Sequence, residues 1–199
     1  MNKPNDLKHI GIIIDGNRRF AKRLMLEPWK GHEVGLKKVE DIVGWLKELN
    51  IKEITIYCFS LENFNRPKKE VDFLMKVFKR EFSKLTKNET VHQDKIKINF
   101  IGKIELFDKE LQEIIHAARE IQKSGEEITE ENFTKHLWLQ TCPDLIIRTG
   151  GDHRTSNFLV WQAAYSEWIF LDKTWPEFEK EDLINSIKEF NNRERRFGK

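Results

Sequence analysis

The sequence predicts an α/β fold in which a mostly parallel central sheet is flanked by helices. Short apolar segments alternate with longer segments whose apolar residues recur at helical spacing, the pattern typical of such a sheet. Residues 11–14 (GIII) form an uninterrupted apolar run, as a strand covered on both faces requires. Arginine-rich polar stretches follow three of the apolar runs, where open α/β sheets bind ligands. The 199 residues predict a single domain, 1–199.

The individual elements follow from the same patterns. Strands are expected at residues 11–14, 51–59, 95–101, 145–147 and 167–171. Helices with one apolar face are expected at residues 32–49, 70–85 and 109–122, and from about residue 179 to the basic tail at 193–199. Thr129, followed by Glu130 and Glu131, is typical of a helix N-terminus, because its hydroxyl can cap free N–H groups and carboxylates favour the first turn.

The composition bears on partners and location. Lys and Arg number 35 against 33 Asp and Glu, so we expect no nucleic-acid partner, and any anion site must be local. No apolar run approaches the roughly 20 residues of a membrane span, and the N-terminus has no apolar signal region, which together predict a cytoplasmic protein. Cys58 and Cys142 have neither metal-site nor redox-motif spacing, so we expect two buried thiols.

Three polar stretches form the candidate ligand site: residues 15–19 (DGNRR), 60–66 (SLENFNR) and 148–157 (RTGGDHRTSN). Each contains arginine, whose planar fork binds phosphate bidentately, so their spread predicts a ligand with more than one phosphate. Asp15, a Gly-Asn turn and a run of cations after a buried strand are typical of a site for an anion and its metal. The alternative is a βα turn with a solvated basic helix start and arginines in structural ion pairs.

Five segments, in order along the chain, resemble the motif series of the cis-prenyltransferases, the undecaprenyl diphosphate synthase family. They are HIGIIIDGNRRFAK, GHEVG, FSLENFNRP, DLIIRTGGDHRTSNFLVWQAAYSEW and NRERRFG. The DGNRR and EPWKGH variants are most similar to archaeal members. The resemblance implies that isopentenyl diphosphate extends an allylic primer, farnesyl or geranylgeranyl diphosphate, to a long-chain polyprenyl diphosphate, the glycosyl carrier lipid precursor. It also implies Mg²⁺, a homodimer, a hydrophobic prenyl tunnel, and a product that associates with the membrane, hence a peripheral membrane location.

The resemblance implies a role for each matching residue. Asp15 matches the essential aspartate that holds Mg²⁺ on the diphosphates, and Glu167 matches a second Mg²⁺ contact. The residues that match the allylic diphosphate contacts are Gly16, Asn17, Arg18, Arg19, Phe20, His32 and Arg66. The residues that match the isopentenyl diphosphate site are Arg148, Arg154, Thr155 and Ser156.

The resemblance also covers the segment after the second strand and the tail. Asn63, with Ser60, matches the catalytic pair near the proton that isopentenyl diphosphate loses, and Leu61 and Glu62 lie between them as substrate contacts. Phe64 matches an aromatic residue against the prenyl chain. Arg196 belongs to an R-x-G match that in the family reaches the diphosphates of the other subunit. The prenyl chain of the substrate would lie in a groove along the apolar stripe Phe73, Leu74, Val77 and Phe78. Core packing would also explain this stripe.

The chain departs from the family pattern at two places. Pro28 stands where the family commonly has an arginine, and Lys30 or Arg23 is the candidate replacement. Near Leu111, a segment of a few tens of residues that contains a strand in the family is absent. Either the protein has lost this strand or the sequence omits it. Because the loss of a central strand exposes sheet edges and reduces the core, we expect the natural protein to contain it.

Two other functions fit parts of the sequence. A catalytically impaired partner subunit of the same fold is favoured by the absent segment but opposed by the intact DGN motif, which begins at Asp15. A Mg²⁺-dependent phosphohydrolase is favoured by the IIID run, but such sites usually need a second aspartate at the position of Asn17.

Overall fold

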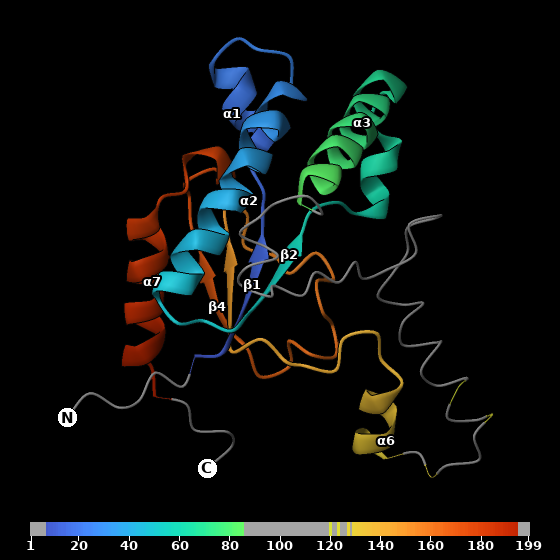
Figure 1. Cartoon of the computed structure of the whole chain (residues 1–199), viewed down its shortest axis with the longest axis vertical. Coiled ribbons are helices and arrows are strands. Elements are labelled where there is room, and N and C mark those ends of the chain that lie inside the picture. The colour runs from blue at the N-terminus through green and yellow to red at the C-terminus, as the bar shows by residue number, and fades with distance from the viewer. Residues whose placement is uncertain (1–6, 86–119, 121–122, 124–126, 128, 195–199) are drawn as a thin grey trace.

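The computed structural model describes residues 7–85, 120, 123, 127 and 129–194. Its centre is a sheet of four parallel strands in the order β2-β1-β3-β4 (Figure 1). The register sets Ile13 between Tyr57 and Arg148, so the strands end at one common edge. The predicted parallel α/β sheet is confirmed. The strands are β1 (His9–Ile13), β2 (Glu53–Tyr57), β3 (Leu145–Arg148) and β4 (Glu167–Phe170).

Most of the described helices lie along this sheet or beyond its carboxyl edge, and α6 (Glu130–Lys135) lies away from it toward the other end (Figure 1). The other helices are α1 (Asn17–Arg23), α2 (Lys30–Glu48), α3 (Lys68–Leu85) and α7 (Lys180–Asn192), with short 3-10 helices η1 (Leu61–Asn65) and η2 (Trp175–Glu177). In Figure 1, α2 and α7 run beside the strands, whereas α1 and α3 stand beyond the arrowheads. Among the described helices, none has the length and apolar character that a membrane crossing needs.

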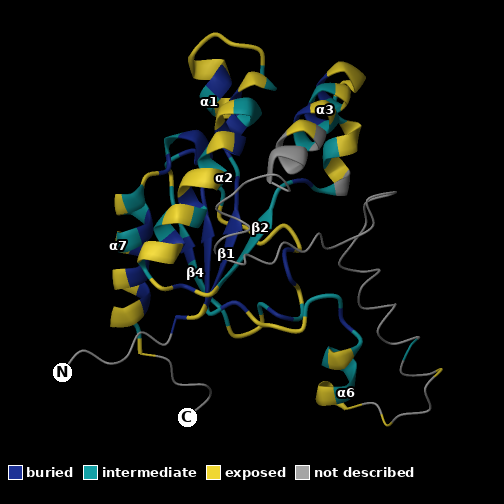
Figure 2. Ribbon diagram, viewed as in Figure 1, coloured by how far each residue is buried: buried dark blue, intermediate teal, exposed yellow. Residues whose placement is uncertain are grey.

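Both faces of the sheet are covered, which explains the uninterrupted apolar run of β1. On one face, Ile12 belongs to a buried cluster with Ile42 of α2 and Leu183 of α7. On the other face, Ile146 of β3 packs in a smaller cluster with Phe158 from the segment after it. Figure 2 shows β1, in the middle of the sheet, coloured as buried, whereas β2 at the sheet edge is intermediate. Burial on both faces fixes where the strands end, and therefore where the polar residues that follow them lie.

Most predicted elements agree with the structure to within two residues at each end. The N-terminus of α6 begins as predicted, because the Thr129 hydroxyl accepts a hydrogen bond from the Asn132 N–H at 3.2 Å. The predicted strand at 95–101 lies outside the described residues. So does the predicted helix at 109–122, except residue 120.

The expectation of two buried thiols is wrong for Cys142. Both cysteines are free, but Cys142 is exposed and Cys58 is half-buried. Cys142 lies in the loop that leads into β3, where the chain has not yet entered the covered part of the sheet.

Two glycines of α2 allow α1 to approach closely. A Cβ atom on Gly31 would lie 1.9 Å from the backbone oxygen of Asn17, and one on Gly35 would lie 2.1 Å from the Asn17 Oδ1 atom. No real Cβ contact is this short, so the two helices can meet only where α2 has no side chain. The GHEVG motif therefore fixes the position of α1, which carries the basic residues that follow Asp15.

Substituting Gly31 with alanine is expected to lower the free energy of unfolding by about 1–3 kcal/mol, because a backbone atom of Asn17 must move to admit the methyl group. Gly44, on the same helix, is the matched control because no atom lies within 4 Å of its Cβ position. Gly44→Ala is expected to stabilise the protein by about 0.5–1 kcal/mol, since glycine is a poor helix former. Urea unfolding of both variants measures the difference. Equal effects would contradict the close approach of α1 and α2.

Candidate active site

Asp15 follows β1 at the carboxyl edge of the sheet and is the centre of the site. Its Oδ1 accepts a hydrogen bond from the Gly16 N–H at 2.6 Å, and its Oδ2 lies 3.0 Å from Arg148 Nη2 and 3.3 Å from Arg19 Nη2. Burial alone would raise the pKa of Asp15, but the bonds from Gly16 and Arg148 and the charge of Arg19 lower it below its usual value. The carboxylate is therefore ionised at neutral pH.

One cluster of polar groups lies on the β3 side of Asp15. Arg148, at the end of β3, is only 3% exposed. Its Nη1 donates to the Ser156 hydroxyl at 2.8 Å and to the backbone oxygen of Arg154. The structure thus brings Arg148, Arg154 and Ser156 together beside Asp15, with Thr155 exposed in the same loop.

Asp152 belongs to this cluster, although the sequence analysis did not single it out. Its Oδ2 accepts from Arg154 Nη2 at 3.0 Å and from Arg19 Nη2 at 3.1 Å. The residue joins the loop after β3 to α1. In the sequence, the position of Asp152 within an arginine-rich stretch could have indicated this role.

A second cluster lies where α1, α2 and α3 meet. Glu70 is 1% exposed, and its Oε1 lies 3.3 Å from Arg18 Nε and 3.3 Å from Arg66 Nη1. Arg66 Nη1 is also 3.2 Å from His32 Nε2. The charge of Asp15 acts on both His32 and Arg66, so this cluster lies near enough to feel the same carboxylate as the first. Sequence analysis placed Glu70 only at a helix start, although its spacing of four residues from Arg66 is typical of an ion pair.

His32 is held in its neutral form. Burial, with the positive charges of Arg66 and Arg18, lowers the pKa of His32 from 6.5 to about 3. Since the unfolded chain takes up this proton near pH 6.5 and the folded chain does not, the stability due to His32 is complete above pH 6.5 and is lost as the pH falls towards 3.

We expect a His32→Gln variant to lose less stability than the parent over this pH range. The slopes of the unfolding free energy against pH should differ between the two proteins by up to ~1.4 kcal/mol per pH unit, the value for one proton. Urea unfolding from neutral to acidic pH measures both curves. The other titrating groups are common to both proteins, so their contributions cancel when one stability curve is subtracted from the other. If the two curves were parallel, His32 would be protonated in the folded state as it is in the unfolded state.

The segment after β2 is ordered by its own side chains. The Ser60 N–H donates to Asn63 Oδ1 at 3.2 Å, and the two residues form a capping box at the start of η1. Glu62, within η1, is exposed. Phe64 is 39% exposed and meets Phe59 edge-on, with ring centroids 5.1 Å apart. Leu61 begins η1. Ser60 and Asn63 are therefore held together, as a joint role would need.

Two predicted site residues have other partners in the structure. The Asn17 side chain is buried and donates through Nδ2 to the Ile14 oxygen at 2.9 Å, and its place in the loop that binds the allylic diphosphate stays a prediction. Glu167 begins β4, and its carboxylate pairs with Arg193 at 2.8 Å. The register puts Glu167 three residues before the level of Arg148, or ~10 Å along the strand. Within the chain, the structure therefore keeps Glu167 away from Asp15.

The remaining predicted residues include Gly16, Phe20 and Arg196. Gly16 has a φ of 91° and turns the chain into α1, a conformation that favours glycine. Phe20 is partly exposed on α1. Arg196 lies outside the described residues.

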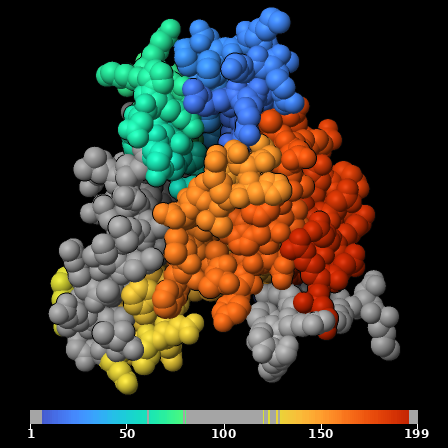
Figure 3. Space-filling view, turned by 180° about the vertical axis from the view of Figure 1, so that it is seen from behind, coloured from blue at the N-terminus to red at the C-terminus, as the bar shows by residue number. Residues whose placement is uncertain are grey.

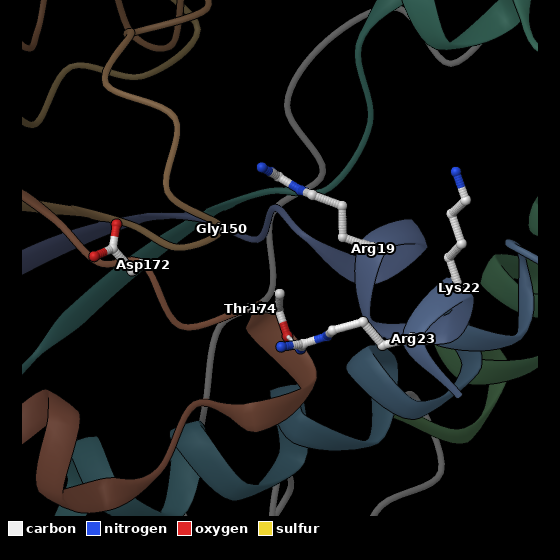
Figure 4. A pocket seen from close by; sticks show the side chains of 6 residues that line it. All are labelled: Arg19, Lys22, Arg23, Gly150, Asp172 and Thr174. Atoms are coloured by element: carbon white, nitrogen blue, oxygen red, sulfur yellow. Dashed lines mark hydrogen bonds between the residues drawn. The ribbon is translucent and has the colours of Figure 1, made fainter. Parts of the chain in front are cut away.

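The two candidates for replacing the arginine lost at Pro28 are held elsewhere. Lys30 Nζ lies 3.2 Å from Glu33 and 5.5 Å from the centre of the Phe73 ring. Arg23 Nη2 lies 2.5 Å from Glu177. Arg23 also lines an open pocket of about 420 Å³, in which it points toward Thr174 (Figure 4). That one of them replaces the missing guanidinium stays a prediction. The pocket is lined by Arg19, Lys22, Arg23, Gly150, Asp172 and Thr174.

Two arginine-containing clusters near the ionised Asp15 suit a transferase that acts on diphosphate esters, because each cluster can bind one anion. The family model described as "putative undecaprenyl diphosphate synthase" matches residues 13–121 and 110–198. The chain therefore belongs to the undecaprenyl diphosphate synthase family. The resemblance seen in its motifs is confirmed, and with it the predicted activity, transfer of prenyl groups to lengthen a prenyl diphosphate.

Individual relatives agree with this assignment. The chain is 41% identical to tritrans,polycis-undecaprenyl-diphosphate synthase (geranylgeranyl-diphosphate specific) of Methanopyrus kandleri, over 96% of this chain and 84% of that protein. It resembles the crystal structure of lavandulyl diphosphate synthase from Lavandula x intermedia, with a TM-score of 0.81 and 29% identity over 99% of this chain and 100% of that one. A probable undecaprenyl diphosphate synthase from Campylobacter jejuni gives a TM-score of 0.80 and 30% identity over the full length of both chains.

The alignments also locate the absent segment. The two matches to the family model overlap at residues 110–121, close to Leu111. The alignment with the Methanopyrus kandleri protein has 229 positions but uses 96% of 199 residues, about 191, so about 38 positions have no counterpart in this chain. Both observations support a shortening of a few tens of residues near Leu111. That the natural protein contains the segment stays a prediction.

Proposed function

We propose that this protein condenses isopentenyl diphosphate with geranylgeranyl diphosphate and repeats the step to form a long polycis-polyprenyl diphosphate. The observation that carries the proposal is the ionised carboxylate of Asp15, which contacts Arg148 and Arg19 of one arginine cluster and acts electrostatically on Arg66 and His32 of the other. The choice of the primer is supported by the Methanopyrus kandleri and Pyrococcus horikoshii relatives, each 41% identical and each named as geranylgeranyl-diphosphate specific.

Each cluster binds one substrate in this proposal. Arg18, Arg66 and His32 hold the allylic diphosphate, and Arg148 and Arg154 hold isopentenyl diphosphate. When the allylic C–O bond breaks, negative charge grows on the leaving diphosphate, and fixed cations stabilise it without reorganising. Glu70 keeps Arg18 and Arg66 side by side before substrate arrives, because its buried carboxylate lies 3.3 Å from both.

The carbon skeleton that comes from isopentenyl diphosphate must lose a proton, so the reaction needs a polar group near that proton. The sequence resemblance assigns this place to Asn63 and Ser60, and the capping box of η1 holds the two together. Proton loss from the condensed product completes the new double bond, and the diphosphate of the second substrate remains on the lengthened chain.

The residues around Asp15 fit a Mg²⁺ ion bound mainly by its substrates. Among the described residues, no group of three or more His, Cys, Asp or Glu side chains could hold a metal by itself. Mg²⁺ often takes only one or two carboxylates together with substrate phosphates. Asp15, ionised and one-third exposed, supplies such a ligand beside both diphosphate clusters. When bound, Mg²⁺ would neutralise charge on the diphosphates.

The prenyl chain lies along α3 in this proposal. Phe73 and Phe78 are partly buried on α3, and Phe78 meets Phe59 edge-on at 6.0 Å. Apolar walls of this kind exclude water from a carbocation. Leu74 and Val77 are 0% and 2% exposed, so they belong to the core and would only support the groove. A closed tunnel stays a prediction.

The proposal is tested by incubating the purified protein with labelled isopentenyl diphosphate, Mg²⁺ and either farnesyl or geranylgeranyl diphosphate. We expect label in butanol-extractable long chains, with the higher rate on geranylgeranyl diphosphate. Release of phosphate without chain growth would support the phosphohydrolase instead. No reaction by a folded protein that binds both diphosphates would support the impaired partner subunit. Faster growth on farnesyl diphosphate would overturn only the choice of the primer.

We propose a peripherally membrane-bound cytoplasmic homodimer whose two sites share Arg196, as the R-x-G match implies. Asp15→Ala and Arg196→Ala, each nearly inactive alone, are allowed to exchange subunits in equal amounts, so that about half the dimers are mixed. If Arg196 acts on the partner's site, each mixed dimer has one whole site, and roughly a quarter of parent activity returns. With exchange shown by tagged subunits, no recovery would mean that Arg196 serves its own chain.

A further inference from the structure

The loop between α1 and α2 carries three consecutive exposed apolar side chains. Leu24, Met25 and Leu26 are 55%, 96% and 47% exposed. We call residues 24–26 the apolar tip. The loop projects from the end of the molecule beyond the carboxyl edge of the sheet (Figures 1 and 2). Figure 3 shows the same end from behind, with α3 beside it.

The conformation of the apolar tip is fixed by the backbone. The N–H of Leu24 donates to the oxygen of Ala21 at 3.0 Å, that of Met25 to Lys22 at 3.1 Å, and that of Leu26 to Ala21 at 2.9 Å. Met25 has a φ of 55°, a left-handed conformation that costs a residue with a Cβ atom roughly 1 kcal/mol. A large apolar residue thus stands where glycine would be less strained, and its side chain points into solvent.

The surroundings of the apolar tip are aromatic and positively charged. Trp29 follows the tip and lies 6.2 Å from Phe73 of α3, with Lys69 Nζ 5.2 Å from the centre of its ring. Lys22 precedes the tip on α1. Within the part of the chain that the structure describes, Lys22 and Lys69 have no ion-pair partner. From residue 18 to residue 30 the sequence has five cationic side chains against one carboxylate, that of Glu27.

We propose that the apolar tip inserts into the surface of an anionic phospholipid bilayer. Three side chains are too few for a stable protein interface, which buries about 800 Å² on each partner, whereas a bilayer accepts a small apolar projection of any shape. Tryptophan favours the membrane–water interface, and lysine side chains reach the headgroups. The unpaired Lys22 and Lys69 therefore give the surface its preference for anionic lipid.

Insertion would also place the reaction beside the membrane. α1 carries Arg18 and Arg19 on the same seven-residue helix that ends at the tip, and α3 begins beside Trp29. A growing apolar chain along α3 would then lie next to the bilayer that must receive it. This consequence rests on the proposed function. The membrane contact itself does not, because it is measured without substrate.

The test is co-sedimentation of the full chain with sucrose-loaded vesicles of phosphatidylcholine, alone or mixed with phosphatidylglycerol. We expect the parent to bind the mixed vesicles and to bind less at high salt, since surface charge is screened. A variant with Leu24, Met25 and Leu26 all replaced by serine should bind them at least ~10-fold more weakly, because insertion buries these side chains. Val34→Ser, on α2, is the control for loss of an exposed apolar side chain, because Val34 is 40% exposed.

Four results separate the membrane contact from the proposed function. Prenyl transfer assayed in detergent should be unchanged in the triple variant, because none of its positions touches the diphosphate clusters. Equal binding of the parent and the triple variant, or no binding by the parent, would overturn the bilayer proposal. Normal vesicle binding by a protein that fails to lengthen prenyl chains would overturn the proposed function alone. A shift of the parent to a larger oligomer that the triple variant lacks, without vesicle binding, would assign the tip to protein contact instead.

Discussion

Asp15→Ala is expected to reduce the rate of prenyl transfer at least ~10²-fold, which corresponds to about 2.7 kcal/mol of transition-state stabilisation. The carboxylate is ionised and contacts Arg148 and Arg19, so its removal takes away the group that we propose holds Mg²⁺ on both diphosphates. Binding of isopentenyl diphosphate should survive, since Arg148, Arg154 and Ser156 remain. Steady-state rates and calorimetric binding of isopentenyl diphosphate measure the two effects separately.

Two further variants sharpen this prediction. Asp15→Asn keeps the shape of the side chain but loses its charge, and we expect a loss of similar size. Asp172, an exposed carboxylate that follows β4 at the same edge of the sheet, is the matched control, and Asp172→Ala should stay within about twofold of the parent. A folded Asp15→Ala protein with near-normal turnover would remove Asp15 from the mechanism.

Glu70→Ala is expected to lower the free energy of unfolding by about 3–5 kcal/mol, a large share of the 5–15 kcal/mol typical of proteins. The Glu70 side chain is 2% exposed, and that of its partner Arg66 is 18% exposed. Removing the carboxylate leaves the mostly buried guanidinium of Arg66 beside Arg18 without its ion-pair partner, which is costly. Urea unfolding measures the loss. Surviving folded protein should also bind the allylic diphosphate more weakly, because the arginines lose their common anchor.

The control for Glu70 lies on the same helix. Lys68 and Asp72 form an ion pair with the same spacing of four residues, but their side chains are 86% and 52% exposed. Asp72→Ala should therefore change stability by at most about 1 kcal/mol. If Glu70→Ala and Asp72→Ala had equal effects, Glu70 would be an ordinary surface charge and not the anchor of the second cluster.

Local patterns were sufficient to predict the sheet and the edge at which ligands bind. The apolar run that ends at Asp15 and the run that ends at Arg148 are strands buried on both faces, so both end in polar residues at the carboxyl edge. Parallel pairing then brings these two residues within 3.0 Å although 132 residues separate them in the chain. The basic helix α1 has no apolar stripe of its own, and so periodicity alone did not mark it as an element.

The orientation of several site residues depended on distant parts of the chain. Asn17 looked like a turn residue facing the ligand, but it is turned inward by its fit against Gly31 and Gly35 of α2. Glu70 was predicted only as the first residue of a helix, and its burial and its contacts with Arg18 and Arg66 appear only in the structure. Sequence spacing along one element carries no information about such contacts between elements.

A crystal structure with both isopentenyl diphosphate and a non-reactive thio analogue of geranylgeranyl diphosphate tests the central claim most directly. We predict that one diphosphate lies within hydrogen-bond distance of Arg18 and Arg66, and the other within reach of Arg154 and Ser156, with Asp15 between them. The sulfur atom of the analogue marks which diphosphate is allylic. Two diphosphates bound away from Asp15, for example in the pocket beside Lys22, would contradict the assignment of the site.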